Sequence, residues 1–366
     1  MRGLRHLHLH DLQHAWCHAL QDVRGEGGRD ATDTRGQEAT RVSRDAAPDF
    51  GALGVVVGHS TDAQGATGLT VVRGASGPMR ASAAILGRAT GTRELDALSP
   101  THLVDRIDAL LLTGGSAYGL AAADGVMRWM EERGRGFPVG SGVVPIVPAA
   151  VVFDLAPLGR YDARPSAAMA YEACERAAAL VEEGSVGAGT GATVGKAGPI
   201  GGAMKGGVGA ALASAGGVTV GAVAVVNAFG DVRDGAGRII AGARGPDGFI
   251  DSERALREQY SPERFGGRPM QNTTLAVVVA SVPLSRIELQ QVARAASAAL
   301  LRRITPAGTS FDGDVIFALA PLEGRGAGIL QVETLAVAAL EDAIERGVRR
   351  ARGRDGVPGL ADEVSA

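Results

Sequence analysis

The sequence predicts an α/β domain built of packed layers. Unbroken apolar runs of strand length, rich in valine, occur in both halves of the 366-residue chain, and segments with helical periodicity lie between them. The chain is 45% hydrophobic but only 4% aromatic, so alanine, valine and leucine must fill the core. Its 54 glycines follow no collagen-like period and indicate many tight turns and close backbone approaches.

Residues 1–48 are predicted to form a flexible extension ahead of this domain. The segment is polar and nearly neutral, it contains Cys17, and five of the seven histidines fall between His6 and His18. A metal-binding arm is the alternative, but no defined ligand set appears. The segment also lacks the continuous apolar core of a secretory signal, and we do not expect it to contribute to the fold.

In the first half of the domain, a short apolar strand runs directly into a Gly-Gly-Ser turn at Gly114, Gly115 and Ser116. Proline residues in the segment 143–155 favour an edge strand or an extended stretch there. The other elements expected in this half are strands at 52–57, 69–73 and 110–112, a helix at about 117–133, and a helix at 166–183 that buries the thiol of Cys174.

In the second half, the clearest helix is predicted at 285–304. Ser285 and Glu288 form a capping box at its start, and Pro306 follows its end. The remaining elements are strands at 218–226, 275–280 and 315–320 and a helix at 332–350, with a loose tail beyond Arg350. We see no internal repeat, and the alternation of strands and helices supports a layered α/β domain.

Charge, hydropathy and cysteine content exclude several classes of protein. The formal net charge is −3 and no basic stripe stands out, which argues against a nucleic-acid partner. No apolar stretch reaches the roughly 18 residues of a membrane span. Two cysteines give no disulfide framework, so a reducing cytoplasm is the expected location.

The glycine-dense stretch 184–217 contains weak matches to nucleotide-binding motifs. Residues 187–192 fit the dinucleotide fingerprint, but a predicted helix precedes them where a strand is required. The phosphate-binding P-loop fails because Ala197 replaces the Ser or Thr that holds magnesium. We therefore expect no nucleotide, other cofactor or metal in the site.

The same stretch holds both lysines of a chain that otherwise uses arginine. Lys196 and Lys205 stand against 35 arginines. Lysine is a compact charge whose pKa burial can shift, so it can take part in proton chemistry that arginine cannot. Chance remains the alternative for each, and Lys205 in particular can be a solvated loop residue.

A polar triplet, Asn272-Thr273-Thr274, stands directly before the apolar run 275–280. It is either an ordinary turn with β-forming threonines or a hydroxyl placed at a strand end for chemistry. The body of the chain has only His59 and His102 and no G-x-S-x-G motif, so a histidine triad is not evident. An N-terminal threonine would supply its own base, because the reference pKa of an α-amino group is about 7.7 to 8.0. Thr273 is internal, so the chain would first have to cut itself.

Seven motifs, in order along residues 50–350, carry a family resemblance. They are "GTRELD" (91–96), "LTGGSAYGLAAADGVMRWM" (112–130), "VPIVPAAVVFDL" (144–155), "GSVGAGTGATVGK" (184–196), "AVVNAFGDV" (224–232), "NTTLAVVVAS" (272–281) and "TSFDGDVIFAL" (309–319). The sequence resembles the P1 peptidase family (family S58), which includes D-aminopeptidases, β-peptidyl aminopeptidases and nylon-oligomer endohydrolases.

The resemblance implies a four-layer αββα sandwich of the self-processing N-terminal-nucleophile type. Cleavage would fall between Asn272 and Thr273, leaving a larger chain (49–272 of the domain) and a smaller chain (273–366) that begins with the nucleophile Thr273. Lys196, Asn227, Asp312 and Asp314 match residues of the nylon-hydrolase site, and Tyr118 matches a tyrosine of the substrate cleft. Small peptides or peptide-like amides are the implied substrates, and a homotetramer of processed heterodimers is the implied assembly.

Each matched residue has a physical role that its chemistry allows. Asn227 ends a strand and can offer its amide N–H to an oxyanion. Asp312 and Asp314 can hold the amine of Thr273, although a charged turn before a strand is the plain alternative. Lys196 can tune the hydroxyl of Thr273.

Two other functions stay open at this point. Ornithine acetyltransferases share the fold and also cut themselves before a threonine, but they transfer the acyl group to an amino acid. The chain can also be an uncleaved member without activity. The sequence does not decide between exo- and endo-cleavage.

Overall fold

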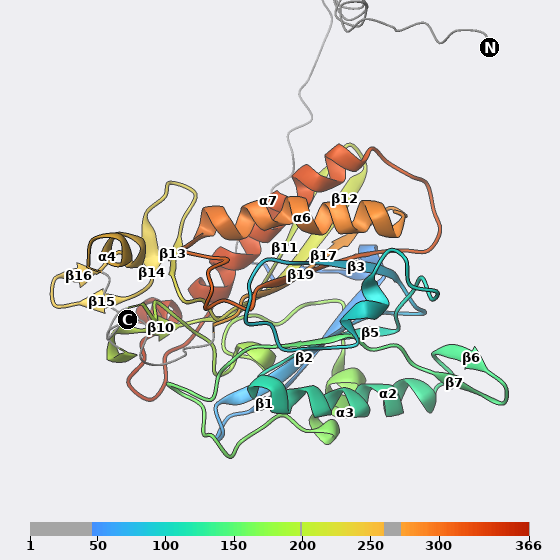
Figure 1. Cartoon of the computed structure of the whole chain (residues 1–366), viewed down its shortest axis with the longest axis horizontal. Coiled ribbons are helices and arrows are strands. Elements are labelled where there is room, and N and C mark those ends of the chain that lie inside the picture. Colours follow the sequence, from blue (N-terminus) through green and yellow to red (C-terminus); the bar gives the residue numbers. More distant parts are fainter. Residues whose placement is uncertain (1–45, 198–199, 260–271, 366) are drawn as a thin grey trace, which may run out of the picture. The chain divides into compact units, whose positions relative to one another are not determined.

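A computed structural model describes residues 46–197, 200–259 and 272–365. Within this part, two five-stranded sheets pack face to face and helices cover both outer faces (Figure 1). α6 (Arg286–Arg303) and α7 (Ile329–Arg349) cover one sheet, and α2 (Ala123–Glu131) and α3 (Ala167–Arg176) cover the other. This is the expected four-layer αββα sandwich. The histidine cluster, Cys17 and nearly all of the extension 1–48 lie outside the described residues.

The two sheets share one pattern of strand directions. The first sheet has the order β1 (Val55–Asp62), β2 (Thr67–Gly74), β5 (Ala109–Thr113), β8 (Ala149–Val151), β4 (Thr92–Arg93). The second has the order β11 (Gly207–Ala215), β12 (Val218–Val226), β17 (Leu275–Ala280), β19 (Val315–Ala320), β3 (Arg80–Ile85). In each, the third and fourth strands are parallel and every other neighbouring pair is antiparallel.

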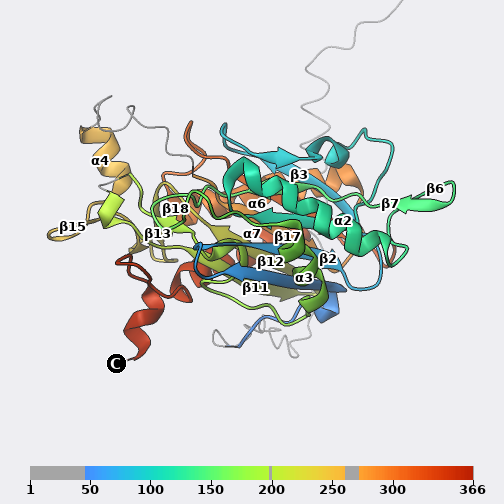
Figure 2. The same ribbon diagram turned by 90° about the horizontal axis from the view of Figure 1, so that it is seen from below.

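The remaining elements are short and lie around these layers. Figure 2 shows the two sheets from the side of α2 and α3, with the hairpin β6–β7 projecting from the body. These elements are β6 (Phe137–Val139), β7 (Gly142–Val144), β9 (Thr193–Val194), β10 (Met204–Lys205), β13 (Asp231–Arg233), β14 (Ile239–Ala241), β15 (Arg244–Gly245), β16 (Gly248–Phe249), β18 (Ile304–Thr305) and α4 (Ser252–Gln259).

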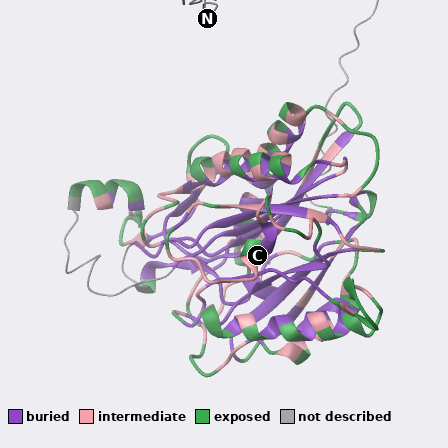
Figure 3. Ribbon diagram, turned by 45° about the vertical axis from the view of Figure 1, so that its right-hand side comes forward, coloured by how far each residue is buried: buried purple, intermediate pink, exposed green. Residues whose placement is uncertain are grey.

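The residues of strand β17 are all apolar because both faces of the strand are buried. Side chains of a strand alternate between its two faces. Leu275, Val277 and Val279 belong to the core between the two sheets, whereas Ala276 and Val278 belong to the core under α6 and α7. Both faces are therefore buried, as Figure 3 shows for the central strands. Each buried valine contributes about 1.5 to 3 kcal/mol relative to an exposed one.

Small residues let the layers approach closely. A Cβ on Gly209 of β11 would lie 2.0 Å from the carbonyl oxygen of Ala343 in α7. Any side chain there would push the helix away from the sheet. The scarcity of aromatic residues and the abundance of glycine and alanine thus correspond to a thin, tightly packed core.

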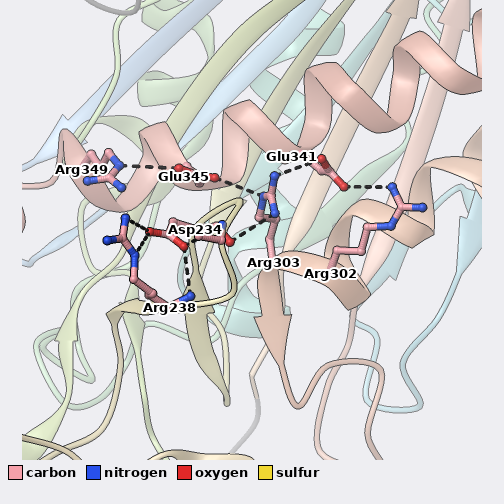
Figure 4. A network of polar contacts seen from close by, with 8 residues as sticks. Asp234, Arg238, Arg302, Arg303, Glu341, Glu345 and Arg349 are labelled. Carbon is pink, nitrogen blue, oxygen red and sulfur yellow. Dashed lines mark hydrogen bonds and ion pairs between the residues drawn. The ribbon is translucent and has the colours of Figure 1, made fainter.

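An ion-pair network fixes α6 and α7 relative to each other (Figure 4). Arg303 of α6 lies 3.0 Å from Glu341 and 3.2 Å from Glu345, both on α7. Arg302 pairs with Glu341 at 3.1 Å, and Arg303 also donates to the carbonyl of Asp234 after β13. Arg303 and both glutamates are less than one-fifth exposed, so water screens these pairs less than typical surface pairs.

Most of the fold predictions agree with the structure, and four differ. The strand expected at 52–57 begins only at Val55, because Gly51–Leu53 forms a 3₁₀ helix before β1. The helix expected at 166–183 ends at Arg176, because Ala178 leaves the helix and bridges Val57 of β1. The helix expected at 117–133 begins as a 3₁₀ helix, Ser116–Ala122, before α2. The tail after Arg350, expected to be loose, has a buried Ala351, and its Pro358 carbonyl accepts the backbone N–H of Lys205.

Candidate active site

Thr273 lies where the two parallel strands of the second sheet begin. It precedes β17, and Asp312, Gly313 and Asp314 precede β19. Parallel strands place their starting ends at the same edge of a sheet, so the two segments meet. A Cβ on Gly313 would lie only 2.7 Å from Thr273 Oγ1. Glycine at 313 therefore leaves the space that the hydroxyl of Thr273 occupies.

The peptide bond between Asn272 and Thr273 is held on both sides. The carbonyl oxygen of Asn272 accepts a 2.7 Å hydrogen bond from the N–H of Gly313, and the N–H of Asn272 donates to Phe311 O at 3.1 Å. The N–H of Thr273 donates to the carbonyl oxygen of Asn227 at 3.1 Å. The Gly313 donor polarises the Asn272 carbonyl in the sense that nucleophilic attack requires.

Asn227 follows β12, the antiparallel neighbour of β17, and three partners fix its side chain. Its Oδ1 accepts from Lys196 Nζ at 2.8 Å and from Thr193 N at 3.1 Å. Its Nδ2 donates to Phe153 O at 3.1 Å. An amide nitrogen carries two hydrogens, so Asn227 Nδ2 has a second hydrogen besides the one that Phe153 O accepts.

Lys196 is buried, and its Nζ donates two hydrogen bonds to Asn227. Nζ lies 2.8 Å from Oδ1 and 3.2 Å from the backbone oxygen that also accepts the N–H of Thr273. Burial lowers the pKa of Lys196 to about 7, and the charges of Asp312, Asp154 and Asp314 oppose that shift. A lysine with this pKa can take and return a proton near neutral pH.

Asp312 and Asp314 are each 2% exposed. Burial raises the pKa of both, and for Asp314 the charge of Asp312 raises it further, to about 7. Asp314 Oδ1 accepts from the N–H of Thr274 at 2.6 Å, and Asp312 Oδ2 accepts from Thr309 N and Oγ1. In the uncut chain the two carboxylates thus flank Thr273, while the direct partner of its nitrogen is the Asn227 carbonyl.

A cavity of about 230 Å³ opens beside Thr273. Its other walls come from the first sheet and its connections. Ser116 and Ala117 follow β5, Val151 ends β8 and Phe153 follows it, and residues 89–91 precede β4. The cavity thus joins the nucleophile end of one sheet to the C-terminal ends of β5 and β8 in the other.

Tyr118 is not among the residues that line this cavity. It follows Ala117, is 50% exposed, and its ring centroid lies 3.4 Å from the guanidinium carbon of Arg164. Phe153, which the sequence did not single out, lines the cavity and also binds Asn227 through its carbonyl. Its position next to an apolar strand gave no signal that separates it from ordinary core residues.

Comparison with known proteins identifies the family. The model of peptidase family S58 matches residues 52–359. The chain belongs to peptidase family S58. It is 43% identical over 340 residues to a protein of Mycobacterium tuberculosis named an uncharacterized aminopeptidase, covering 84% of this chain and 95% of that one. It is 31% identical over 312 residues to the 6-aminohexanoate-oligomer endohydrolase of a Kocuria species, covering 80% and 81%.

Solved structures show the same fold. A β-aminopeptidase of a Burkholderia species aligns with a TM-score of 0.62 at 21% identity, covering 88% of this chain and 92% of that one. An L-aminopeptidase D-Ala-esterase/amidase of Ochrobactrum anthropi, described as a variant of the Ntn-hydrolase fold, aligns with a TM-score of 0.61 at 19% identity, covering 87% and 90%. The S58 protein is therefore an amide-bond hydrolase with the N-terminal-nucleophile hydrolase fold.

Lys205 of the S58 hydrolase is not a solvated loop residue. It is 1% exposed, and its Nζ donates to the carbonyl oxygens of Gly189, Ala192 and Gly206, each at 2.9 Å. Burial lowers its pKa to about 7, while three carbonyl acceptors favour the ammonium form. Lys205 pairs with Thr193 across β9 and β10, so it supports the strand whose N–H binds Asn227.

Asp154 is a further buried carboxylate that sequence reasoning missed. It is fully buried, accepts from Thr67 Oγ1 at 2.6 Å and from Gly115 N at 2.7 Å, and burial raises its pKa to about 6. Asp154 directly follows Phe153 and binds the N–H of Gly115. It therefore links two parts of the cavity wall, at Phe153 and at Ser116. A lone aspartate after an apolar run carries no sequence signal for this role.

Across residues 46–197, 200–259 and 272–365 there is no group of three or more His, Cys, Asp or Glu side chains placed to hold a metal ion. The helices in these ranges are also too short or too polar to cross a membrane. Cys174 is buried, and burial raises the pKa of its thiol to about 12, consistent with a packing role.

Proposed function

We propose that this S58 hydrolase cuts itself between Asn272 and Thr273 and then uses Thr273 as an N-terminal nucleophile on small peptides or peptide-like amides. The observation that carries the proposal is the position of Thr273. It heads a buried strand at the cavity, and its peptide bond is fixed between the N–H of Gly313 and the carbonyl of Asn227.

In the cleavage step, Thr273 Oγ1 attacks the carbonyl carbon of Asn272. The oxyanion forms on Asn272 O, where the N–H of Gly313 already donates. The hydroxyl proton passes to the nitrogen of Thr273, the C–N bond breaks, and an ester between Asn272 and the hydroxyl remains. Water hydrolyses this ester and leaves a free amine on Thr273. Lys196 and Asp314, each with a pKa of about 7, are the candidate groups for moving the proton.

In the hydrolysis step, the free amine of Thr273 is the base. Its reference pKa of about 7.7 to 8.0 suits proton transfer near neutral pH. Thr273 attacks the substrate carbonyl, and Asn227 offers its second Nδ2 hydrogen to the oxyanion. The amine passes the proton to the leaving nitrogen, and water then releases the acyl group from Thr273. Asp312 and Asp314, when they are ionised, supply negative charge that favours the protonated amine.

Substitution of Thr273 tests the proposal. Thr273→Ala removes the hydroxyl and should abolish both self-cleavage and amide hydrolysis, whereas Thr273→Ser keeps a hydroxyl and should still be cleaved. Thr274→Val is the matched control, because it removes the neighbouring buried hydroxyl and should keep both activities. Gel analysis and a p-nitroanilide assay on all three variants give the result. Activity in Thr273→Ala with loss in Thr274→Val would move the nucleophile to Thr274.

Two assays on the same purified protein distinguish the rival functions. Acetyl transfer from acetylornithine to glutamate would indicate an acyltransferase, and a stable uncut chain without hydrolysis would indicate a non-enzymatic member. The homotetramer stays a prediction. Light scattering at micromolar concentration tests it, and an active monomer would count against it.

A further inference from the structure

We infer that the Thr273 cavity accepts an uncharged acyl group, so that this hydrolase prefers N-blocked or internal amides to amides of a free amino acid. The inference rests on the proposed function, because it assumes that Thr273 attacks the amide. It concerns the part of the substrate that the proposed function leaves open.

The walls of the cavity are neutral. Among residues 46–197, 200–259 and 272–365, those that line it are uncharged: the polar ones are Thr90, Ser116 and Thr273, and the bulky apolar ones are Val151 and Phe153. Hydroxyl groups can hydrogen-bond the C=O and N–H of an amide. They do not balance the charge of an ammonium group, whose transfer out of water is costly without an ionic partner.

The carboxylates that flank the cavity lie behind its walls. Asp154, Asp312 and Asp314 are 0%, 2% and 2% exposed. Their oxygens accept hydrogen bonds from Thr67 and Gly115, from Thr309, and from Thr274 and Gly308, respectively. None of the three is a lining residue. They are therefore poorly placed to pair with a substrate ammonium.

An amide of a free amino acid would bring such an ammonium into this space. In an α- or β-aminoacyl substrate the nitrogen is one or two carbons from the scissile carbonyl, so it must enter the cavity with the acyl group. An acyl group that continues into another amide carries no charge there and can use the hydroxyls of Thr90 and Ser116.

Matched p-nitroanilides test the inference on the processed wild-type protein. L-alanyl and isobutyryl anilides differ by NH₃⁺ against CH₃, as do β-alanyl and butyryl anilides, and N-acetyl-L-alanyl restores an amide. At pH 7 the neutral member of each pair should have at least about tenfold higher kcat/KM. Relative to its neutral partner, the alanyl anilide should gain activity as pH rises through about 8, where its own amine loses the proton.

A charge placed on the wall sharpens the test. Ser116 lines the cavity with φ of +53°, a left-handed conformation that Asp and Asn tolerate better than most residues. Ser116→Asp should raise the alanyl-to-isobutyryl ratio about tenfold over Ser116→Asn, which has the same shape without the charge.

The outcomes separate this inference from the proposed function. An alanyl or β-alanyl anilide cleaved as well as its neutral partner by the wild-type protein would overturn the inference and leave Thr273 as nucleophile. Equal ratios in Ser116→Asp and Ser116→Asn would remove the charge argument and overturn it as well. A processed protein that hydrolyses no member of either pair would overturn the proposed function.

Discussion

The two sheets have the same strand pattern but contribute opposite kinds of residue to the site. In the second sheet, the parallel pair β17–β19 brings its starting ends to the cavity, with Thr273 before one strand and Asp312 and Asp314 before the other. In the first sheet, the parallel pair β5–β8 brings its finishing ends, which continue into neutral wall residues such as Ser116 and Phe153. One sheet supplies the reacting groups, and the other supplies the surface that a substrate meets.

A deeply buried carboxylate from each sheet, Asp314 from the second and Asp154 from the first, lies at this end, and their contacts differ. Asp314 binds the backbone next to the nucleophile, whereas Asp154 binds Thr67 and Gly115 behind the walls. This difference predicts two different effects of substitution. Changes on the nucleophile side should reduce the rate of chemistry, and changes on the wall side should reduce substrate binding.

Apart from loss of the Thr273 hydroxyl itself, the largest loss is expected for Lys196→Met. The change removes the ammonium that binds both oxygens of Asn227, and with it the buried group whose pKa of about 7 suits proton transfer. Self-cleavage and hydrolysis should each fall by roughly 100-fold or more, the scale of one positioned acid–base group. Time courses of cleavage on gels and an anilide assay measure both rates.

Lys205→Met is the matched comparison at the other buried lysine. It should act mainly on stability, on the order of 3 kcal/mol, because it removes the ammonium hydrogen bonds to three buried carbonyl oxygens. Two of these, Gly189 O and Ala192 O, keep a backbone N–H donor. Thermal melts recorded beside the activity assays separate the two lysines. Equal, small losses of activity in both variants would remove Lys196 from the chemistry.

Asp154→Leu should disturb the cavity walls and weaken substrate binding rather than slow the chemical step. Without the carboxylate, Gly115 N–H and the hydroxyl of Thr67 lose their acceptor, and the turn at Ser116 loses its anchor. We expect KM to rise about tenfold with a smaller change in kcat, as for a loss of binding. Steady-state kinetics decide the point, and a fall in kcat at constant KM would place Asp154 on the chemical side instead.

The smallest effect concerns the pH dependence of Asp314. Its pKa is about 7 in the folded protein against 3.8 for an ordinary aspartate, so between pH 4 and 7 the folded state binds a proton that the unfolded state releases. Stability contributed by this group therefore falls as pH rises through that window. In the uncut Thr273→Ala background, adding Asp314→Asn should gain on the order of 1 kcal/mol relative to its parent from pH 4 to 7. Melts that keep a constant offset across the window would contradict this shift.

The strands that carry the site were predictable from sequence, but several contacts were not. β12, β17 and β19 begin and end where the apolar runs do, because both faces of each strand are largely buried. Lys196, Asn227 and Thr273, which the motifs single out, lie in contact through the Asn227 carbonyl, and their catalytic roles stay predictions. Local patterns of this kind depend on burial and on spacing within one segment.

What the sequence could not predict depends on contacts between distant segments. Phe153 and Asp154 reach the site only because β8 pairs with β5 in the other sheet. The burial of Lys205 depends on a turn at 189–192 closing over it, which a glycine-rich stretch does not reveal. Tyr118 was expected in the cleft from its motif, but the 3₁₀ turn after Gly115 places it beside Arg164.

The mass of the purified wild-type protein tests the central claim most directly. Cleavage before Thr273 divides the 37.2 kDa chain into about 27.6 kDa (residues 1–272) and about 9.6 kDa (residues 273–366), taking a near-average residue mass on both sides. Intact mass spectrometry of fresh and aged protein should show the larger species giving way to these two, and N-terminal sequencing of the small chain should begin Thr-Thr-Leu-Ala. A single uncut mass in a protein that hydrolyses amides at full rate would contradict Thr273 as an N-terminal nucleophile.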